Sequence, residues 1–460
     1  MKTLISLCLC VFVAAPMLQG AVRPPLSEAA KNGDKETLRS LLQKGANVNA
    51  TEGDGTTALH WATYRDDIES ADLLLRAGAK VNAANDLGVT PLWSACENGS
   101  AAMVRRLLAA GANPNAKLLA GETPLMMASR VGNPGIVEQL LAKGADPNAR
   151  GARGQTALMW AVSQQHPAVV KVLLAGKADV QARSNAWTDV MAVTPHGYIP
   201  YNRAVPHGND SAILFAARVG DLASAKLLVD ARANVNDTDA WGISATELAA
   251  HSGFTDVVEF LLDKGSDAKG GKAGFTALHI AIMRRDERMA AALLAHGADV
   301  NAKLGTWTPT RRSSNDFNFE PELVGATPLW LAARFTEPNI MRLLLKHGAD
   351  PLFVHHAERV PDRFPWEVRK EVITPLMAAV GMGGGGTGWV ELDRSQRESR
   401  MLETVKLAVE LGINVNAANT DGRTALDAAR ALKFESVISY LVEKGAKAGT
   451  GTPARGARGQ

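Results

Sequence analysis

Short apolar stripes alternate with polar turns along most of this chain, and residues 85–116 show the unit most clearly. Leu92 and Ala95 form a first stripe, and Val104 and Leu107 lie on a second stripe at the spacing of a helix with one apolar face. The pattern predicts two short helices joined by a turn and followed by a polar connection. Isolated helices shorter than about 12–15 residues are marginal in water, so each unit needs neighbours that cover its apolar faces.

Residues with special backbone or capping properties mark the ends of these two helices. Thr90 is placed to cap the first helix, and Pro91 takes the first helical position, where its missing N–H costs nothing. Gly99 ends the first helix, and Gly111 stands where a left-handed cap is needed after the second. The unit is therefore predicted as helix, turn, helix and a long connection, which we call the finger.

The cap glycine recurs with a fixed period, and a short string recurs with it. Gly45, Gly78, Gly111 and Gly144 are spaced by 33 residues each time. The matching strings at the start of the first helix are TALHWA (57–62), TPLWSA (90–95), TPLMMA (123–128), TALMWA (156–161), TALHIA (276–281), TPLWLA (327–332), TPLMAA (374–379) and TALDAA (424–429). Lys177 and Arg232 stand at two of the cap positions and are expected to keep the left-handed geometry, with strain on the order of 1 kcal/mol each.

With this period and these strings, the chain resembles the ankyrin-repeat family. The resemblance implies an all-α solenoid of about eleven helix-turn-helix units, with fingers that project along one edge of a concave face and a role in binding proteins. Core residues are mainly small, since hydrophobic content is 46% and aromatic content only 5%. The predicted repeats are one to five at 22–183, six to eight at 211–303, nine at 325–353, and ten and eleven at 374–447.

The repeat spacing grows in three places, where cap positions lie 55, 51 and 64 residues apart. Counting from cap to helix start assigns the extra residues to enlarged fingers at 184–210, 304–324 and 354–373. The third interval also holds an insertion between the two helices of repeat ten, at 381–401. The three fingers are expected to rise from the same edge of the solenoid.

These enlarged fingers and the groove beside them are the predicted partner-binding surface. Clustered aromatic residues in loops are typical of binding surfaces, although the same side chains could instead fold back and pack on the solenoid. The finger candidates are Trp187, Tyr198, Tyr201, Trp241, Trp307, Phe317 and Trp366. The candidates from the end of the first helices and from one ordinary finger are Tyr64, Asp86, Leu87, Val89, Glu97, Arg130, Arg218 and Arg334. The arginines among them suggest a mildly basic groove. The alternative is that these positions are simply exposed to solvent and that their excess of basic residues arose by chance.

The two chain ends carry separate predictions. Residues 1–21 have the pattern of a secretory signal, with Lys2 before an apolar run too short for a comfortable membrane span; an uncleaved anchor is the alternative. Removal of this segment would leave Cys96 as the single cysteine, so no intramolecular disulfide is expected. The protein is therefore predicted to be exported, to the periplasm or beyond. Residues 448–460 are predicted to be a disordered tail.

Other motifs give weak signals for chemistry. The GMGGGG string (381–386) formally contains GxGxxG, but it follows a predicted helix rather than a strand, so a loop is favoured over a dinucleotide site. His355 and His356 suggested a metal site, but adjacent residues of an extended segment point in opposite directions. The resemblance implies a structural hydrogen bond for His60 and His279. No catalytic residue, metal ligand or cofactor is predicted.

A protein-binding scaffold is the function that these observations favour. The formal net charge of +3 argues against a dedicated nucleic-acid binder, and no membrane contact is expected beyond the export signal. Two alternatives remain open: a secreted effector that uses the same surface on a host protein, and an enzyme whose site is built from the inserted loops. Polar and titratable groups converging in a deep pocket would favour the enzyme.

Overall fold

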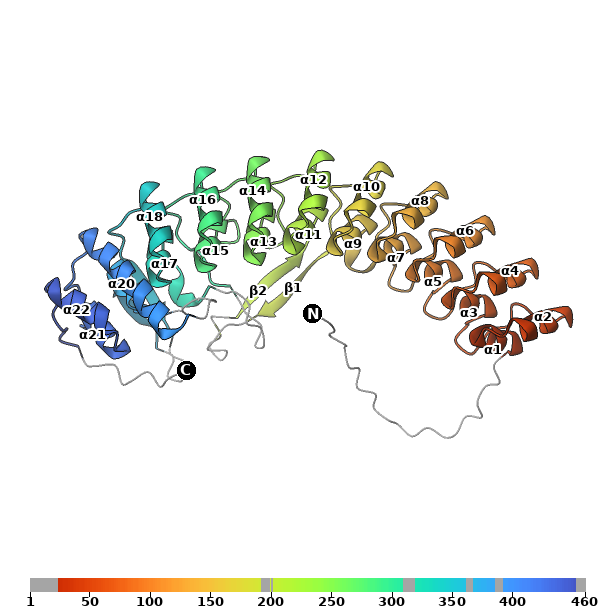
Figure 1. Cartoon of the computed structure of the whole chain (residues 1–460), viewed down its shortest axis with the longest axis horizontal. Coiled ribbons are helices and arrows are strands. Elements are labelled where there is room, and N and C mark those ends of the chain that lie inside the picture. The colour runs from red at the N-terminus through yellow and green to blue at the C-terminus, as the bar shows by residue number, and fades with distance from the viewer. Residues whose placement is uncertain are drawn as a thin grey trace, which may run out of the picture. The chain divides into compact units, whose positions relative to one another are not determined.

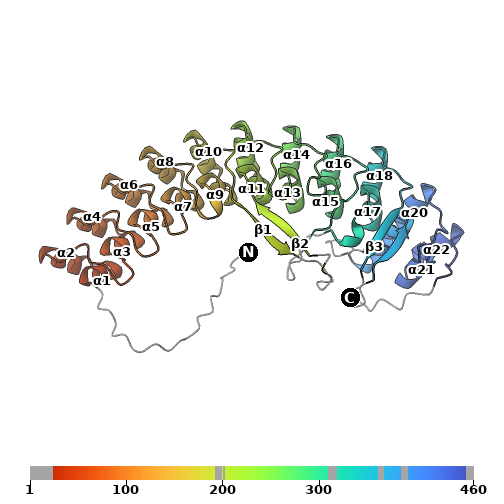
Figure 2. The same ribbon diagram turned by 180° about the vertical axis from the view of Figure 1, so that it is seen from behind.

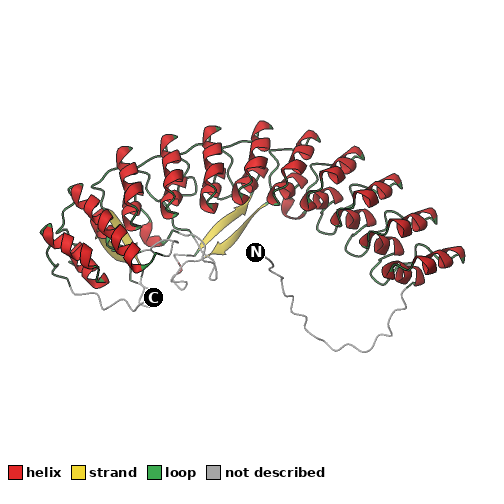
Figure 3. Cartoon of the chain, viewed as in Figure 1, coloured by secondary structure: helices red, strands yellow, loops and turns green. Residues whose placement is uncertain are grey.

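The computed structural model describes residues 24–191, Ile199, and residues 202–308, 319–360, 367–384 and 392–451. The chain divides into two compact units, Met1–Asp146 (unit 1) and Pro147–Gln460 (unit 2), and each is described by itself. The described residues hold twenty-two α-helices, which follow one another in eleven pairs. The predicted all-α solenoid is confirmed, and it is supplemented by two short β-hairpins in unit 2 (Figure 3).

Unit 1 contains four helix pairs. Their bounds are α1 Pro25–Asn32, α2 Lys35–Gln43, α3 Ala58–Tyr64, α4 Ile68–Arg76, α5 Pro91–Glu97, α6 Ala101–Ala109, α7 Pro124–Val131 and α8 Pro134–Ala142.

Unit 2 contains seven helix pairs, two hairpins and two short 3₁₀ helices. The helices are α9 Ala157–Ser163, α10 Pro167–Ala175, α11 Ala212–Val219, α12 Leu222–Asp230, α13 Ala245–Ser252, α14 Thr255–Asp263, α15 Ala277–Met283, α16 Glu287–Ala295, α17 Pro328–Arg334, α18 Pro338–Lys346, α19 Pro375–Ala379, α20 Arg394–Glu410, α21 Ala425–Leu432 and α22 Glu435–Glu443. The other elements are β1 Ala186–Met191, β2 Arg203–Gly208, β3 His355–Arg359, β4 Arg369–Ile373, η1 Ala152–Gly154 and η3 Pro321–Leu323.

Within each unit the helices form two layers (Figure 1). The first helix of a repeat packs on the first helix of the next, as α3 does on α5 and α11 on α13, while the second helices form a parallel row, as α14 and α16 do. The core lies between the two layers and consists mostly of Ala, Leu, Val and Met. Short helices built from small residues approach one another closely, which explains why so few aromatic residues suffice.

The cap residues act as the sequence predicts. The Thr90 side chain accepts a hydrogen bond from Trp93 N, and Pro91 begins α5. Gly111 is left-handed, with φ of 90°. Lys177 and Arg232 hold the same left-handed geometry, with φ of 65° and 67°, so the stack imposes this conformation even where a side chain disfavours it.

In seven of the described repeats, an asparagine four residues after the cap links one finger to the next. The Asn82 amide donates to Gly111 O at 3.1 Å, and its carbonyl oxygen accepts from Asn113 N at 2.7 Å. The same two bonds are made by Asn49, Asn115, Asn148, Asn236, Asn301 and Asn416. This asparagine clamp satisfies a helix-terminal carbonyl and fixes the start of the following finger.

Two of the enlarged fingers form antiparallel hairpins. β1 pairs with β2 from Ala186 opposite Gly208 to Met191 opposite Arg203, and β3 pairs with β4. Ordinary fingers already contain single bridges of this kind, such as Thr238 to Ser244. The insertions therefore lengthen a turn that is already hairpin-like, and both hairpins rise from the finger side of unit 2 (Figure 2).

Two predicted boundaries differ from the structure. Residues 394–401 belong to α20 and not to a loop, because Asp393 and Gln396 form a capping box that starts the helix early. At the C-terminal end, residues 448–451 were expected to be disordered, but Gly449 N donates to the Asp427 carboxylate at 2.8 Å and Gly451 N to Gly422 O at 3.1 Å. Residues 452–460 and the predicted signal segment 1–21 lie outside the described residues. Within the described part of the chain, no helix has the length and apolar character needed to cross a membrane.

Removing one asparagine clamp should weaken the stack. Asn236→Ala deprives Gly265 O and Asp267 N of their partner, so we expect the free energy of unfolding to fall by about 1–2 kcal/mol. Lys269 holds the equivalent position in the next repeat without an amide, so Lys269→Ala is the matched control and should cost less than about 0.5 kcal/mol. Denaturant unfolding followed by circular dichroism measures both, and equal losses would contradict the clamp.

Candidate partner-binding surface

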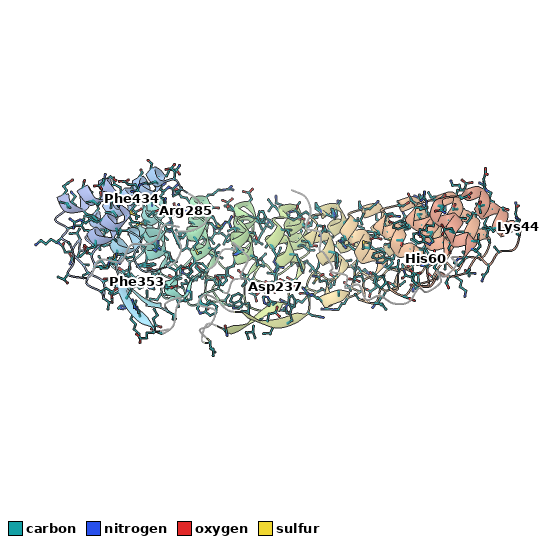
Figure 4. All side chains as sticks on the ribbon, turned by 90° about the horizontal axis from the view of Figure 1, so that it is seen from below. Lys44, His60, Asp237, Arg285, Phe353 and Phe434 are labelled. Carbon is teal, nitrogen blue, oxygen red and sulfur yellow. The ribbon has the colours of Figure 1, made fainter. Side chains whose placement is uncertain are left out.

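The fingers and both hairpins of unit 2 share one side of the molecule. Figure 4 shows Asp237 and Phe353, which lie on fingers, on the side of the hairpins, and Arg285 and Phe434, which lie between the two helices of a repeat, on the opposite side. The prediction of a common finger edge therefore holds for the hairpins of this unit.

Charged and polar side chains fix the base of the β1/β2 hairpin to the solenoid. Arg183 forms an ion pair with the buried carboxylate of Asp237, which also accepts from the Ser211 hydroxyl. Ser184 N donates to Asp210 O at 2.9 Å, and the Ser184 hydroxyl accepts from Asp210 N at 2.9 Å. The two strands therefore leave the stack from a rigid base.

Trp187 combines packing with partial exposure. Its ring stacks on His207 with centroids 5.6 Å apart, and the Arg153 guanidinium lies 4.9 Å from its centroid. Gly208 lies so close that a Cβ there would come within 2.6 Å of the ring. Trp187 keeps 38% of its surface exposed, so it anchors the hairpin and still has an exposed edge.

The other face of this hairpin is apolar and exposed. Side chains alternate between the two faces of a strand, so Val190, Thr188 and Ala186 point away from the face of Trp187, together with Ala204 on β2. Val190 is 77% exposed, and the other three are also exposed. This face, which we call the outer hairpin face, carries no charged side chain.

The finger 304–324 contains a side chain that folds back. Phe319 is buried, and its ring centroid lies 5.6 Å from that of Phe275. The ring centroid of Phe275 lies 6.1 Å from that of Trp241. Trp241 and Trp307 are half-buried. In the described part of this finger, aromatic side chains therefore pack on the solenoid and do not form an open aromatic surface.

The β3/β4 hairpin lies against neighbouring fingers. His355 is buried, its Nε2 lies 2.8 Å from Glu322 O, and its ring centroid lies 4.4 Å from that of Trp330. His356 is exposed on the opposite face of the strand, as expected for neighbours in an extended segment. Among the described residues, no group of three His, Cys, Asp or Glu side chains is arranged to hold a metal ion.

The prediction of Arg334 as an open groove residue is wrong. Only 6% of Arg334 is exposed, and its Nε donates to Gly384 O at 2.9 Å. Burial lowers the pKa of Arg334 to about 10. The glycines of the GMGGGG string allow this cover, because Gly383 approaches the Trp330 ring closely and both Gly383 and Gly384 have left-handed φ values.

The remaining candidates divide into exposed and half-buried positions. Tyr64, Asp86, Leu87, Glu97, Arg130 and Arg218 are exposed, and Val89 is half-buried. Arg218 pairs with Asp210 at 2.8 Å; with Arg334 buried as well, the predicted basic groove loses two of its charges. Tyr198, Tyr201, Phe317 and Trp366 lie outside the described residues.

Sequence reasoning missed Leu119 in unit 1. It is 79% exposed and its N–H donates to the carbonyl of Leu87, which is 63% exposed, at 3.1 Å. This backbone bond places the two exposed leucines on adjacent finger tips. The signal was present in the sequence, since Leu87 lies one residue and Leu119 two residues before a finger glycine.

Comparison with protein families gives a match over more than half of the chain. Three stretches, 26–118, 111–184 and 213–303, match a family described as "Ankyrin repeats (3 copies)", and residues 324–356 match the single ankyrin repeat. The chain is an ankyrin-repeat protein. It is also similar to a zebrafish (Danio rerio) protein named "Putative palmitoyltransferase ZDHHC13", with 27% identity over 263 residues. That match covers 52% of this chain and 36% of the zebrafish protein, so the chain spans about a third of the relative's length.

The ankyrin histidines make structural hydrogen bonds that join a helix start to the next finger, as the resemblance implied. His279 Nδ1 accepts from Thr276 N at 3.1 Å, and Nε2 then carries the proton that is donated to Ala302 O at 3.0 Å. His60 makes the equivalent bonds to Thr57 and Val89. Burial lowers the pKa of His279 to about 4 and also lowers that of His60.

In two repeats a glutamate or an aspartate stands at the position of this ankyrin histidine, and the next finger then turns a different backbone group towards it. Glu247 accepts from Ser244 N and from Gly271 N at 2.8 Å, and Asp427 accepts from Thr424 N and Gly449 N. A carboxylate has no proton to donate, so the finger presents an N–H instead of a carbonyl.

The buried histidine should make the stability of this ankyrin protein depend on pH. The pKa of His279 is lower in the folded state, about 4, than the roughly 6.5 of an unfolded histidine. Its stabilising contribution is therefore complete above pH 6.5 and is lost as the pH falls towards 4. His279→Gln keeps an acceptor and a donor but does not titrate. Between pH 7 and pH 4.5 the wild type should lose about 2–3 kcal/mol more unfolding free energy than His279→Gln. Parallel pH profiles of the two proteins would contradict this assignment.

Proposed function

We propose that this ankyrin-repeat protein binds a protein partner chiefly through the β1/β2 hairpin of unit 2. Ankyrin repeats support a protein–protein interaction role. The finer assignment rests on one observation, the uncharged outer hairpin face with Val190 77% exposed. Large exposed apolar side chains on a surface otherwise rich in charge are typical of interaction sites.

The rigidity of the hairpin base supports this proposal. The Arg183–Asp237 ion pair, the Ser184–Asp210 bonds and the packed Trp187 ring hold the two strands before any partner arrives. A preordered surface loses little conformational entropy on association. The exposed face of the β3/β4 hairpin differs, because it carries the charged pair Glu358 and Lys370.

We also propose that the role is one of binding and not of catalysis. The zebrafish relative is named a putative palmitoyltransferase, but the match covers 36% of its length. Within the described residues the perturbed titratable groups of unit 2, such as Glu247, His279 and Arg334, are engaged in packing and finger bonds.

The partner proposed here is an exported one, on the strength of the apolar run in residues 1–21. A secreted effector role would use the same surface on a host protein. Expression of the full chain should yield a protein whose first residue, determined by mass spectrometry, lies close to Ala21. An intact Met1 in the exported fraction would favour an uncleaved anchor, and absence of the protein from that fraction would contradict export.

A charged side chain on the outer hairpin face should weaken partner binding. Val190→Asp places a carboxylate where an apolar contact is proposed, and we expect affinity for the partner to fall at least about tenfold. Val368→Asp is the matched control, because Val368 is a 44% exposed valine beside the other hairpin. Proteins recovered with the tagged wild-type chain are identified by quantitative mass spectrometry, and the purified partner is then titrated against all three proteins by calorimetry.

The two variants also separate the competing explanations. Unchanged affinity of Val190→Asp would overturn the hairpin assignment. Equal losses for both variants would place the contact on a broader finger surface, and melting temperatures measured in parallel would show whether either substitution acts through the fold.

A further inference from the structure

The pairing of β1 with β2 fixes which backbone groups of the hairpin point outward. Thr188 lies opposite Pro206. Proline has no N–H, so these two residues cannot exchange two hydrogen bonds, and they form a non-hydrogen-bonded pair of the antiparallel ladder. The N–H and C=O groups of Thr188 therefore point away from β2. Those of Val190, two residues further along the strand, point the same way.

The carbonyl of Gly208 supports this pairing independently and closes the edge of β2. Gly208 lies two residues after Pro206, and its carbonyl accepts from Ala240 N in the following finger at 2.9 Å. It therefore points away from β1, as the alternation of the ladder requires. Since Pro206 offers no donor beside it, β2 is a poor template for a further strand.

The edge of β1 is open by comparison. At its base the Asn185 N–H donates to Arg153 O of the preceding finger at 2.7 Å. Beyond this point the strands extend away from the helices (Figure 2). Among the described residues, no backbone group from outside the hairpin bonds to Thr188 or Val190. We call the outward N–H and C=O groups of these two residues the β1 edge.

The sequence of β1 carries few of the features that keep an edge strand unpaired. Such strands commonly contain lysine, proline or a bulge. β1 reads AWTDVM, and its register with β2 is continuous. Ala186, Thr188, Asp189 and Val190 are all exposed. The β1 edge is therefore both accessible and able to form further backbone hydrogen bonds.

We infer that an extended segment of the partner protein adds to the β1 edge as a third strand of this hairpin. The inference rests on the proposed function, in which the hairpin binds a protein partner, and it specifies the conformation of the bound segment. Donors and acceptors that recur about every 7 Å along an edge match the backbone of another extended strand. A partner helix could not match them, because its own N–H and C=O groups are bonded internally.

The side chains of β1 indicate the composition of such a segment. On the outer hairpin face its residues would lie beside Thr188 and Val190, where β-branched apolar side chains pack well. On the other face it would lie beside the exposed carboxylate of Asp189, which accepts from Trp187 Nε1 at 3.2 Å. Opposite charges on neighbouring strands attract. The segment should therefore alternate apolar with basic residues.

The same edge of a second copy of this chain fits less well. Antiparallel pairing over most of β1 places Thr188 opposite either Thr188 or Val190 of the other copy. The two Asp189 carboxylates then lie diagonally or directly opposite each other on one face of the sheet. Like charges at such positions are destabilising, so a partner segment with a basic residue is the better occupant.

Peptides with a defined hydrogen-bonding edge test the strand addition. The probe is a blocked peptide in which valine alternates with lysine, titrated against the full chain by fluorescence anisotropy. Replacing its lysines by glutamates should weaken binding at least about tenfold. N-methylation of the valines should abolish binding to an antiparallel site, and N-methylation of the lysines should preserve it, because only one set of N–H groups faces β1. A parallel site reverses the two results.

Proline substitutions on the two edges of the hairpin provide a matched pair of variants. Thr188→Pro removes an outward N–H from β1, and Ala204→Pro removes one from β2; both residues are exposed on the outer hairpin face. Thr188→Pro should raise the dissociation constant of the valine–lysine peptide at least about tenfold. Ala204→Pro, and Thr188→Ala, which keeps the N–H, should bind it as the wild type does. Circular dichroism and melting temperatures check that each variant is folded.

Four outcomes would overturn the inference. They are a valine–lysine peptide that does not bind the wild type, equal effects of the two N-methylations, an affinity that Thr188→Pro leaves unchanged, and a wild-type dimer in analytical ultracentrifugation that Thr188→Pro dissociates. The last outcome would assign the β1 edge to a second copy.

The protein partner recovered with the tagged chain separates this inference from the proposed function. If Val190→Asp weakens binding of that partner and Thr188→Pro does not, the hairpin binds through its outer face and only the strand addition is rejected. If neither substitution weakens binding, the proposed function is rejected as well.

Discussion

The contact between one repeat and the next is the interaction on which the rest of this structure depends. Its helices have mostly seven to nine residues, too few to persist in water by themselves. Their apolar faces become a core only when a neighbouring repeat covers them, and Val258 or Met341 reaches zero exposure for that reason. Stability is therefore a property of neighbouring pairs, and an end of the stack differs from its middle.

A second coupling runs along the fingers. The asparagine clamp joins the cap of one repeat to the finger before it, and the residue three places into the first helix reaches the following finger. His279 donates to Ala302 O, whereas Glu247 accepts from Gly271 N. The chemistry at the helix start thus dictates which backbone group the next finger must turn inward. Gly271, with φ of 87°, supplies the backbone freedom that this reversal requires.

Most of the stack was predictable because its signals are local and repeated. Caps such as Thr90 and Gly111, and the left-handed Lys177, follow from period and position. The errors arise where distant segments meet. Arg334 has the sequence context of an exposed helix end, but the Gly384 segment lies over it. The early start of α20 had a local signal in Asp393 and Gln396 that the repeat register concealed, whereas the burial of Phe319 depends on Phe275 in another finger.

The three finger insertions lie where added residues disturb the stack least. A finger is anchored at its base by the clamp and by the following helix cap, so residues added beyond the base do not change how helices pack. The β1/β2 hairpin follows this logic, because Arg183, Asp237 and Ser184 hold its base. The outer hairpin face does not contribute to the core, since Val190 is 77% exposed. An exposed valine in an uncharged patch lowers solubility without stabilising the fold, which makes contact with another protein the simplest physical reason for its presence.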